Sequence, residues 1–457
     1  KCNFLIFERF IRRSVSIFVA RMKISSKKVV SQILGALKSA GINDVVLTPG
    51  SRNAPFSISL ANDSFFEVYS IVDERSAAFF ALGLSQQSKR PTALICTSGT
   101  ALLNYAPAIA EAYYQRIPLL VISADRPEEW IDRGEGQSIR QNNVFQNYCD
   151  YSASLFADEK EASAQNLEFI QKTFQAVVSS NGPVHLNVPF QEPLYELMEC
   201  NELPVFQFEK ETEVFNVSSE IMETIHGAEK IMVLVGQHGY EDFSKELSVF
   251  NRLQQVVVFT ETHANVNIES AFPCIDRMIM GLGAHAQQAL APDVLITIGT
   301  NIISRKIKAI LRKAKPKHIQ VGVNEKPMDT FDCLFAQSHV SPHFFFNALN
   351  EIQSNSNWKN DLLALQSRQI KQVEAWLPTA SYSDLTVFSS LLKFIPEGTH
   401  VQMGNSSVVR YIQLFNQNEK LTYFGNRGVA GIDGSTSTAI GAAWKTKKPT
   451  LLIFFNK

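Results

Sequence analysis

The segment FEVYSIVDERSAAFFALGLS, residues 66–85, contains a strand, a turn and a helix in direct succession. Its first part, FEVYSIVD, is rich in the β-branched and aromatic residues that favour strands. Asp73 then stands where a helix N-cap belongs, and Glu74 falls in the first turn of the apolar helix that follows. A strand that leads straight into a helix is the unit from which parallel α/β sheets are built.

The same alternation continues along the whole chain and falls into three groups. The other predicted strands are DVVLTP, TALICTS, PLLVISAD and PVHLNVP in the first group, KIMVLVG, QVVVFTE, DVLITIG and HIQVGVN in the second, and THVQMG, LTYFGN and TLLIFF in the third. Strands that alternate with helices predict a parallel sheet covered on both faces. We therefore expect an α/β protein of three consecutive parallel-sheet domains, the third incomplete. The predicted domains are 22–195, 226–355 and 380–457, with 196–225 as a linker.

Composition restricts the classes of function. The 457 residues are 45% hydrophobic and 19% charged, as in ordinary globular proteins, and the net charge of -1 gives no reason to expect nucleic acid or an anionic membrane as partner. No apolar run reaches the roughly 18–20 residues of a membrane-spanning helix. The six cysteines are scattered without a CxxC pair, which suits a reducing compartment, so we expect a cytoplasmic location.

Basic residues follow several of the predicted strands. They are Arg52 beside Ser51 in PGSRNAP, Arg126 in SADRP, Arg305 and Lys306 in TNIISRK, Arg410 one helical turn after Ser406 in GNSSVVR, and Arg427 in GNRG. Each taken alone is explained as a solvated or salt-bridged surface charge. Together they indicate a site for several carboxylates, because the guanidinium group pairs with a carboxylate through two hydrogen bonds.

Three further motifs have a structural and a functional interpretation. Glu74 is either an ordinary first-turn acid or a carboxyl group whose apolar neighbours raise its pKa, so that it serves as a proton donor. The TSGT turn with Ser98 and Gly99 can present backbone N–H groups to an anion, although it matches neither standard phosphate-loop pattern. GIDG, residues 431–434, is better explained as a glycine turn before a helix than as a metal motif.

Taken in order, the motifs PGSRNAP, DERSAAFFALG, TSGTALLN, ISADRPEE, GQSIRQ, GNSSVVR and GNRGVAGIDG resemble one family closely. This is the family of 2-succinyl-5-enolpyruvyl-6-hydroxy-3-cyclohexene-1-carboxylate synthases, which are thiamine-diphosphate enzymes of menaquinone biosynthesis. The resemblance extends over nearly the whole chain. TSGT stands where acetolactate synthases have TSGPG, which argues against that related group.

The resemblance implies a reaction and a set of site residues. The reaction decarboxylates 2-oxoglutarate and adds the remaining carbanion to isochorismate, with thiamine diphosphate and Mg²⁺ as cofactors. Glu74 is implied to hydrogen-bond the aminopyrimidine ring of the cofactor, Ile432 to support it, and Ser98 and Gly99 to contribute to cofactor binding. The positions that match substrate-binding residues of the family are Ser51, Arg52, Arg126, Gln137, Arg305, Lys306, Ser406, Arg410 and Arg427. The family order is SKR where this chain has Ser304, Arg305 and Lys306, which leaves the separate roles of these two cations open.

The resemblance also implies how the domains are used. The first domain is of the pyrimidine-binding type and the third of the diphosphate-binding type. The cofactor is expected between the first domain of one subunit and the third domain of its partner, so a homodimer is the expected minimum active unit.

Both ends of the chain depart from the family pattern. Residues 1–21 are basic and aromatic, and we expect them to be an upstream extension before a start at Met22, with an organellar transit peptide as the alternative. In the family, the strand matching TLLIFF leads to a GDLS-type segment that holds Mg²⁺, whereas here Asn456 and Lys457 follow. We therefore expect no metal ligands, a truncated third domain and impaired activity.

Two other functions stay open. One is a different thiamine-diphosphate 2-oxo acid decarboxylase or carboligase, and the other is a non-catalytic, degenerate protein that binds a dicarboxylate. A dinucleotide-dependent enzyme is least favoured, because the glycine fingerprint is missing.

Overall fold

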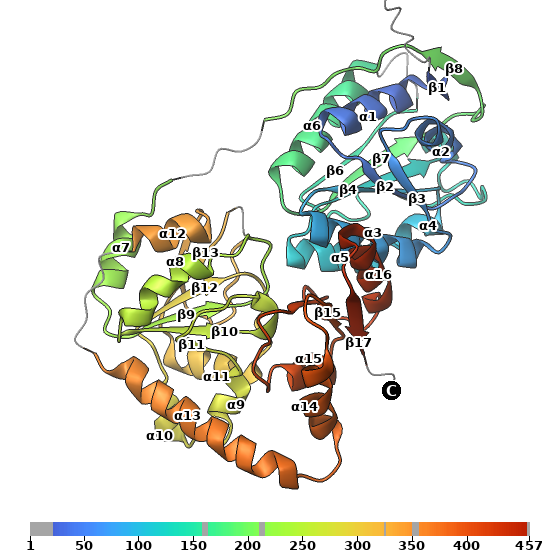
Figure 1. The fold of residues 1–457 in the computed structure, drawn as a ribbon. Helices are drawn as coiled ribbons and strands as arrows, with labels where there is room; N and C mark the ends of the chain where they lie inside the picture. Colours follow the sequence, from blue (N-terminus) through green and yellow to red (C-terminus); the bar gives the residue numbers. More distant parts are fainter. Residues whose placement is uncertain (1–21, 158–162, 210–214, 324–325, 350–355, 455–457) are drawn as a thin grey trace, which may run out of the picture.

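The computed structural model describes residues 22–157, 163–209, 215–323, 326–349 and 356–454. The predicted extension 1–21 lies outside these residues. The described chain contains three sheets of parallel strands with helices packed against them, and a two-stranded antiparallel pair (Figure 1). The predicted α/β class with successive parallel sheets is confirmed.

The first sheet has six parallel strands in the order β3-β2-β4-β5-β7-β6. The strands are β2 (Asp44–Leu47), β3 (Glu67–Ser70), β4 (Thr92–Cys96), β5 (Leu119–Asp125), β6 (Tyr151–Ser154) and β7 (Val184–Pro189). All residues of β2, β4, β5 and β7 are buried, as expected for strands covered on both faces.

Helices cover this sheet on its two faces, because successive residues of each strand point to opposite sides. Val45, Ile95 and Leu120 pack on one side, against α1 (Lys28–Ser39), α2 (Ala54–Ala61) and α6 (Ser163–Ser179). Val46, Leu94 and Val121 pack on the other, against α3 (Glu74–Ser88), α4 (Thr100–Leu103) and α5 (Ala106–Gln115). A short 3-10 helix, Glu128–Trp130, lies in the long loop after β5.

The range 196–225, predicted to be a linker, contains regular structure. It includes β8 (Leu197–Cys200) and most of α7 (Ser219–His226). β8 pairs antiparallel with β1 (Met22–Ser25), with Met22 opposite Cys200, and Cys200 is buried in the first core. This pairing joins segments about 170 residues apart, so the acidic composition of the range could not reveal it. The domain boundaries themselves stay a prediction.

The second sheet also has six parallel strands, in the order β11-β10-β9-β12-β13-β14. They are β9 (Ile231–Val235), β10 (Val256–Thr260), β11 (Ala271–Phe272), β12 (Val294–Ile298), β13 (Lys317–Val321) and β14 (Leu334–Ser338). One face packs against α7, α8 (Ser244–Leu247) and α12 (Pro342–Ala348). The other packs against α9 (Ile275–Ile279), α11 (Arg305–Ala314) and α13 (Trp358–Trp376), with α10 (Ala284–Ala289) at the periphery. Short 3-10 helices occur at Ser248–Arg252 and Thr262–Ala264.

The third sheet has three parallel strands in the order β16-β15-β17. They are β15 (His400–Met403), β16 (Thr422–Gly425) and β17 (Thr450–Ile453), accompanied by α14 (Asp384–Phe394), α15 (Ser407–Ile412) and α16 (Ser435–Thr446). The chain reaches this sheet through α13 and a 3-10 turn, Leu377–Thr379 (Figure 1). The helix α13 has 19 residues and occupies part of the interval between the predicted second and third domains, where no helix was expected.

The helices α3 and α16 cross at very short range, which brings the first and third sheets together (Figure 1). A Cβ atom on Gly83 would lie 2.2 Å from the carbonyl oxygen of Thr438, and one on Gly441 would lie 2.2 Å from that of Phe80. Only glycine fits at both positions, because the two backbones touch directly. Beside the crossing, Lys445 Nζ lies 2.6 Å from an oxygen of the buried Asp44 carboxylate.

We predict that Gly83→Ala destabilises the protein by about 1–3 kcal/mol, because the added methyl group forces the two backbones apart. In an exposed helix the same substitution would stabilise the protein by up to about 1 kcal/mol. A decrease in stability therefore identifies the close contact of the two helices as the cause. Urea unfolding followed by circular dichroism measures the difference. Gly239→Ala is the matched control, because a Cβ there has no atom within 4 Å. Equal stability of the two variants would contradict the proposed contact.

Candidate functional site

The two six-stranded sheets each have one point at which neighbouring strands lead to connections running in opposite directions, and ligands of α/β proteins bind at the carboxyl ends of such strands. In the first sheet this point lies between β2 and β4, and in the second between β9 and β12. The PGSRNAP and TSGT turns directly follow β2 and β4. Ser51 and Arg52 therefore lie at a position where a ligand is expected, whereas Arg126 and Gln137 follow β5.

Arg52 is buried in the turn after β2, and its guanidinium group contacts two neighbouring residues. Its guanidinium group donates to the carbonyl oxygen of Phe190 at 3.0 Å and lies 3.4 Å from the Glu192 carboxylate. Its backbone N–H donates to Thr97 Oγ1 at 3.3 Å. Ser51, the preceding residue, is exposed. The turn therefore fixes the orientation of Arg52 and leaves Ser51 free for contact with a ligand.

Arg126 lies close enough to Arg52 for the two charges to interact. Burial, followed by repulsion from Arg126, lowers the pKa of the Arg52 guanidinium. Arg126 is itself held by a 2.8 Å hydrogen bond from Nε to the carbonyl oxygen of Gly136. Two cations fixed near one another repel, and an anion between them relieves the repulsion. In this structure the Glu192 carboxylate already pairs with Arg52.

Gln137 belongs to a loop that is tied to the TSGT turn. Ser98 Oγ donates to the carbonyl oxygen of Gln137 at 2.9 Å, and a Cβ on Gly99 would lie 3.1 Å from the Gln137 Cα. The N–H of Gly99 donates to Gln141 Oε1 at 2.7 Å, so it is not free to bind an anion. In this structure Ser98 and Gly99 contact the loop of Gln137, while the Gln137 side chain stays exposed. Their predicted role in cofactor binding is not tested.

A buried polar network supports this loop and was missed from the sequence. Gln141 Nε2 donates to Asn187 Oδ1 at 2.9 Å, and Asn187 Nδ2 donates to Asp125 at 2.8 Å. Burial raises the pKa of Asp125 to about 6. The signal was an asparagine inside PVHLNVP, an otherwise apolar strand, because a buried amide needs polar partners.

In the third part of the chain, Arg427 is partly buried in the turn after β16. Its NH1 donates to Asn405 Oδ1 at 2.6 Å. Burial lowers the pKa of Arg427, the carboxylates Glu261 and Glu111 oppose this change, and the nearby charge of Arg410 adds to it. Arg410 is exposed on α15. Arg410 therefore acts on the charge of Arg427, but less strongly than the two carboxyl groups do.

Ser406 has an unusual backbone conformation, with φ of 69° and ψ of -116°. Residues other than glycine rarely adopt it, at a cost of order 1–3 kcal/mol, and such strain is concentrated at functional sites. Ser406 is exposed at the carboxyl end of β15, directly before α15. The strain supports its prediction as a substrate-binding residue.

Arg305 and Lys306 are both exposed at the start of α11. Lys306 lines a cavity of about 760 Å³ between α9, α10 and α11, together with Ile310 and Lys313. This cavity does not include the other predicted substrate residues. The role of Lys306 in substrate binding stays a prediction.

A smaller cavity of about 370 Å³ lies at the carboxyl ends of β15 and β17, between α3 and α16. Its walls include Phe79 and Ser76 from α3 and Ile432, whose side chain is 80% exposed. Glu74 begins the same helix, and Asp73 caps it by accepting the N–H of Ser76 at 2.8 Å, as predicted.

The cavity fits the two ends of thiamine diphosphate. Ile432 and Phe79 provide apolar surface for the rings. At the other end, Ser435, Thr436 and Ser437 line the cavity at the start of α16, which has no side-chain cap, so its free N–H groups suit a diphosphate. The resemblance implied walls from two subunits, whereas here both walls belong to one chain.

No magnesium site is apparent in the described part of the chain, where no three His, Cys, Asp or Glu side chains gather in a way that could hold a metal ion. Likewise, no helix among the described residues has the length and apolarity needed to cross a membrane.

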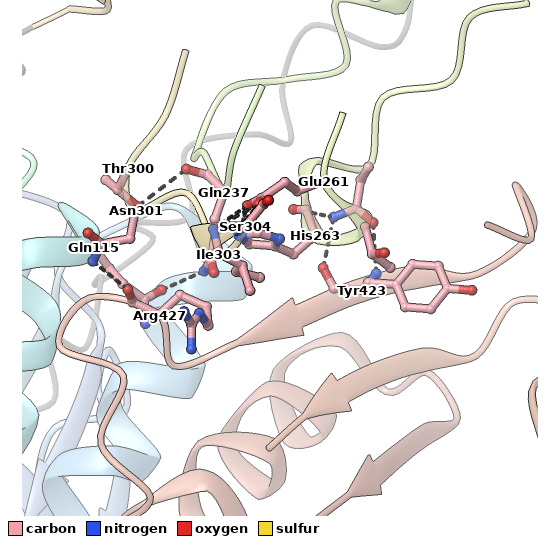
Figure 2. Close-up of polar contacts among 12 residues, drawn as sticks. Gln115, Gln237, Glu261, His263, Thr300, Asn301, Ile303, Ser304, Tyr423 and Arg427 are labelled. Carbon is pink, nitrogen blue, oxygen red and sulfur yellow. Dashed lines mark hydrogen bonds and ion pairs between the residues drawn. The ribbon is translucent and has the colours of Figure 1, made fainter. Parts of the chain in front are cut away.

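Glu261 is a buried carboxyl group at the end of β10 that sequence reasoning also missed. It accepts hydrogen bonds from the backbone N–H groups of Ile303 at 2.7 Å and Ser304 at 2.9 Å (Figure 2). Burial raises the pKa of Glu261 to about 7. His263 Nε2 lies 3.8 Å away, but burial lowers the pKa of His263 to about 3, so this imidazole is neutral at pH 7 and forms no ion pair.

We predict that Glu261 contributes stability that is lost as the pH rises from about 4.5 to about 7, because native Glu261 holds its proton in this range and the unfolded chain does not. Buried imidazoles with a lowered pKa, such as His263, change the free energy of unfolding in the opposite direction, so the contribution of Glu261 is the difference between the wild-type curve and that of Glu261→Gln. The contribution is about 1–3 kcal/mol. Glu261→Gln keeps an oxygen acceptor for both N–H groups and should lose this pH dependence, whereas Glu168→Gln, on the surface of α6, should keep it. Denaturant unfolding at several pH values measures it, and parallel curves for all three proteins would contradict the assignment.

Comparisons with known proteins identify the family of this chain. Residues 27–154 match the family model described as "Thiamine pyrophosphate enzyme, N-terminal TPP binding domain". The chain is 39% identical over 434 residues to the 2-succinyl-5-enolpyruvyl-6-hydroxy-3-cyclohexene-1-carboxylate synthase of Flavobacterium johnsoniae, an alignment that covers 93% of this chain and 78% of the relative. It is 40% identical over 432 residues to the synthase of the same name from Flavobacterium psychrophilum, with the same coverage.

A third relative of the same name, from Porphyromonas gingivalis, is 35% identical over 453 residues, covering 94% of this chain and 78% of the relative. Identity of this degree across nearly the whole chain includes all three sheets. The chain therefore belongs to the 2-succinyl-5-enolpyruvyl-6-hydroxy-3-cyclohexene-1-carboxylate synthase family of thiamine-diphosphate enzymes.

Proposed function

We propose that the protein decarboxylates 2-oxoglutarate and joins the remaining four-carbon unit to isochorismate in menaquinone biosynthesis. The observation that carries this proposal is the cavity between α3 and α16, which places the helix of Glu74 against Ile432 and the uncapped start of α16. A different thiamine-diphosphate carboligase is not favoured by the names of the relatives, and neither is a non-catalytic binding protein.

The two pairs of arginines match the chemistry of the proposed substrates. Both 2-oxoglutarate and isochorismate carry two carboxylates. Arg52 with Arg126, and Arg427 with Arg410, each provide two positive charges within electrostatic range of one another. We propose that these residues bind and orient the substrate carboxylates, with Ser51, Gln137 and Ser406 as polar neighbours.

The residues around the smaller cavity have proposed roles toward the cofactor. Thiamine diphosphate, when bound, supplies the electron sink for decarboxylation. Glu74 holds a proton for the pyrimidine ring at its carboxylate oxygen, and Ile432 supports the rings. The start of α16, which has no side-chain cap, would bind the diphosphate through its free N–H groups.

Four further statements are proposals that rest on the family. They are the use of Mg²⁺, a homodimer as the active unit, a cytoplasmic location, and the division into domains at 22–195, 226–355 and 380–457.

We predict consumption of isochorismate that depends on 2-oxoglutarate, thiamine diphosphate and Mg²⁺. Isochorismate loss is followed by its ultraviolet absorbance, with carbon dioxide release as a second measurement. Replacing 2-oxoglutarate by pyruvate should abolish the reaction. Turnover with pyruvate would favour another carboligase, and cofactor binding without turnover of either acid would contradict the proposed function.

We predict that Glu74→Gln lowers kcat by about 10²–10⁴, the range typical for the loss of a general acid or base. The amide keeps the size of the side chain but cannot exchange a proton in the same way. Glu168→Gln, a substitution on the exposed face of α6, should leave kcat unchanged. Wild-type kcat in Glu74→Gln would remove Glu74 from the proposed chemistry.

A further inference from the structure

The turn at residues 427–429, which includes Arg427, is held by one residue on a helix of the first sheet and one residue that follows a strand of the second sheet. It follows β16 and lies over the point where β9 and β12 of the second sheet diverge, beside Gln237 and Asn301 (Figure 2). A ligand would be expected at such a point. Here, the backbone of residues 427–429 approaches Asn301 instead.

Glu111, from α5 of the first part of the chain, accepts two backbone hydrogen bonds from this turn. Its carboxylate lies 2.5 Å from the N–H nitrogen of Gly428 and 2.8 Å from that of Val429. Glu111 is 1% exposed and has no basic side chain as an ion-pair partner within the described residues. A Cβ on residue 428 would lie 2.4 Å from the Glu111 carbonyl oxygen, so the turn approaches α5 as closely as glycine permits.

Asn301, which follows β12 in the second part of the chain, binds backbone carbonyl groups of the same turn. Its Nδ2 donates to the carbonyl oxygen of Arg427 at 2.6 Å and also to that of Gly428. Glu111 and Asn301 therefore bind the N–H and C=O groups of adjacent residues. Backbone groups fixed in this way allow little rotation of the peptide plane that follows Arg427.

The two holding residues are themselves connected. Gln115 Nε2 donates to Glu111 at 2.5 Å, and Gln237 Nε2 donates to Gln115 Oε1 at 2.6 Å. The carbonyl oxygen of Gln237 accepts the N–H of Thr300, next to Asn301, at 2.8 Å. These hydrogen bonds connect α5 with the segments that follow β9 and β12, where Gln237, Thr300 and Asn301 lie near the turn of Arg427 (Figure 2).

The side chain of Arg427 is fixed separately, by Asn405 from the third sheet. Burial lowers the pKa of Arg427, and the attraction of Glu261 and Glu111 opposes this change. The first and second parts of the chain therefore supply the backbone support for one arginine of the third.

We propose that Glu111 and Asn301 are positioning residues that set the orientation of Arg427 toward a substrate carboxylate, an inference that rests on the proposed function. Neither residue contacts the substrate. Their role is to hold the turn at residues 427–429 so that the guanidinium group is already oriented when the carboxylate arrives.

Two isosteric substitutions test this, each with a matched reference. Glu111→Gln removes the acceptor for Val429, and Asn301→Asp removes the donor to the carbonyl groups of Arg427 and Gly428. The reference is Asn265→Asp, because Asn265 also joins the second and third parts of the chain, donating to the carbonyl oxygen of Tyr423 at 2.9 Å, but lies away from the turn. All three variants weaken contacts between parts of the chain, and only the first two disturb Arg427.

The assays use the full chain with cofactor and Mg²⁺. We expect Glu111→Gln and Asn301→Asp to raise the KM of at least one of the two substrates about tenfold, while kcat changes less than about twofold. This pattern means that the variants lose binding energy that is the same in the ground state and in the transition state. Asn265→Asp should leave both KM values within about twofold of wild type. Unchanged KM values in both variants, or an equal rise in Asn265→Asp, would overturn the inference. If Glu111→Gln does not fold, Asn301→Asp decides the question alone.

Hydrogen–deuterium exchange gives a readout that does not depend on activity. Peptides covering residues 426–431 should exchange faster in Glu111→Gln and in Asn301→Asp than in wild type, and those of the first sheet should not. An inactive wild-type protein would refute the proposed function, whereas unchanged exchange in both variants would refute the holding of the turn. The two failures are therefore distinguishable.

Discussion

The close crossing of α3 and α16 is the contact on which the arrangement of the site depends. Gly83 and Gly441 allow the two backbones to touch, and the cavity lined by Phe79 and Ile432 lies at one end of that crossing. A side chain at either glycine would separate the helices and with them the walls of the cavity. Because the two helices belong to sheets that are far apart in the sequence, their contact also determines how the first and third parts of the chain face each other.

Buried carboxyl groups stabilise this arrangement in three places, each through hydrogen bonds rather than ion pairs. Asp125 accepts from Asn187, Glu261 from the N–H groups of Ile303 and Ser304, and Glu111 from those of Gly428 and Val429. A buried carboxylate without partners is strongly unfavourable, so each of these groups requires its neighbours to be in place. This requirement makes the loops around the arginines rigid, which favours binding of substrates in one orientation.

Much of the fold could be predicted from the sequence, because strand and helix patterns are local properties. FEVYSIVDERSAAFF shows a strand that leads into a capped helix, and Asp73 caps it by accepting the N–H of Ser76. The strands of all three sheets were identified in the same way, although the short β6, β11 and β14 were missed. The pairing of β1 with β8 was missed for a different reason, because it joins two segments distant in the sequence, neither of which is apolar enough to indicate a strand on its own.

By itself, the sequence determined the α/β class, the family, and the set of arginines suited to dicarboxylates, because these follow from residue types and their order. Only the tertiary structure decided how those residues are grouped. It pairs Arg52 with Arg126 and Arg427 with Arg410, places Lys306 at another cavity, and gives Glu111 and Asn301 contacts with a turn more than 100 residues away. A lone Glu in the apolar helix NYAPAIAEAYYQR indicates a buried acid, but its partners are backbone groups, and backbone groups leave no signal in a sequence.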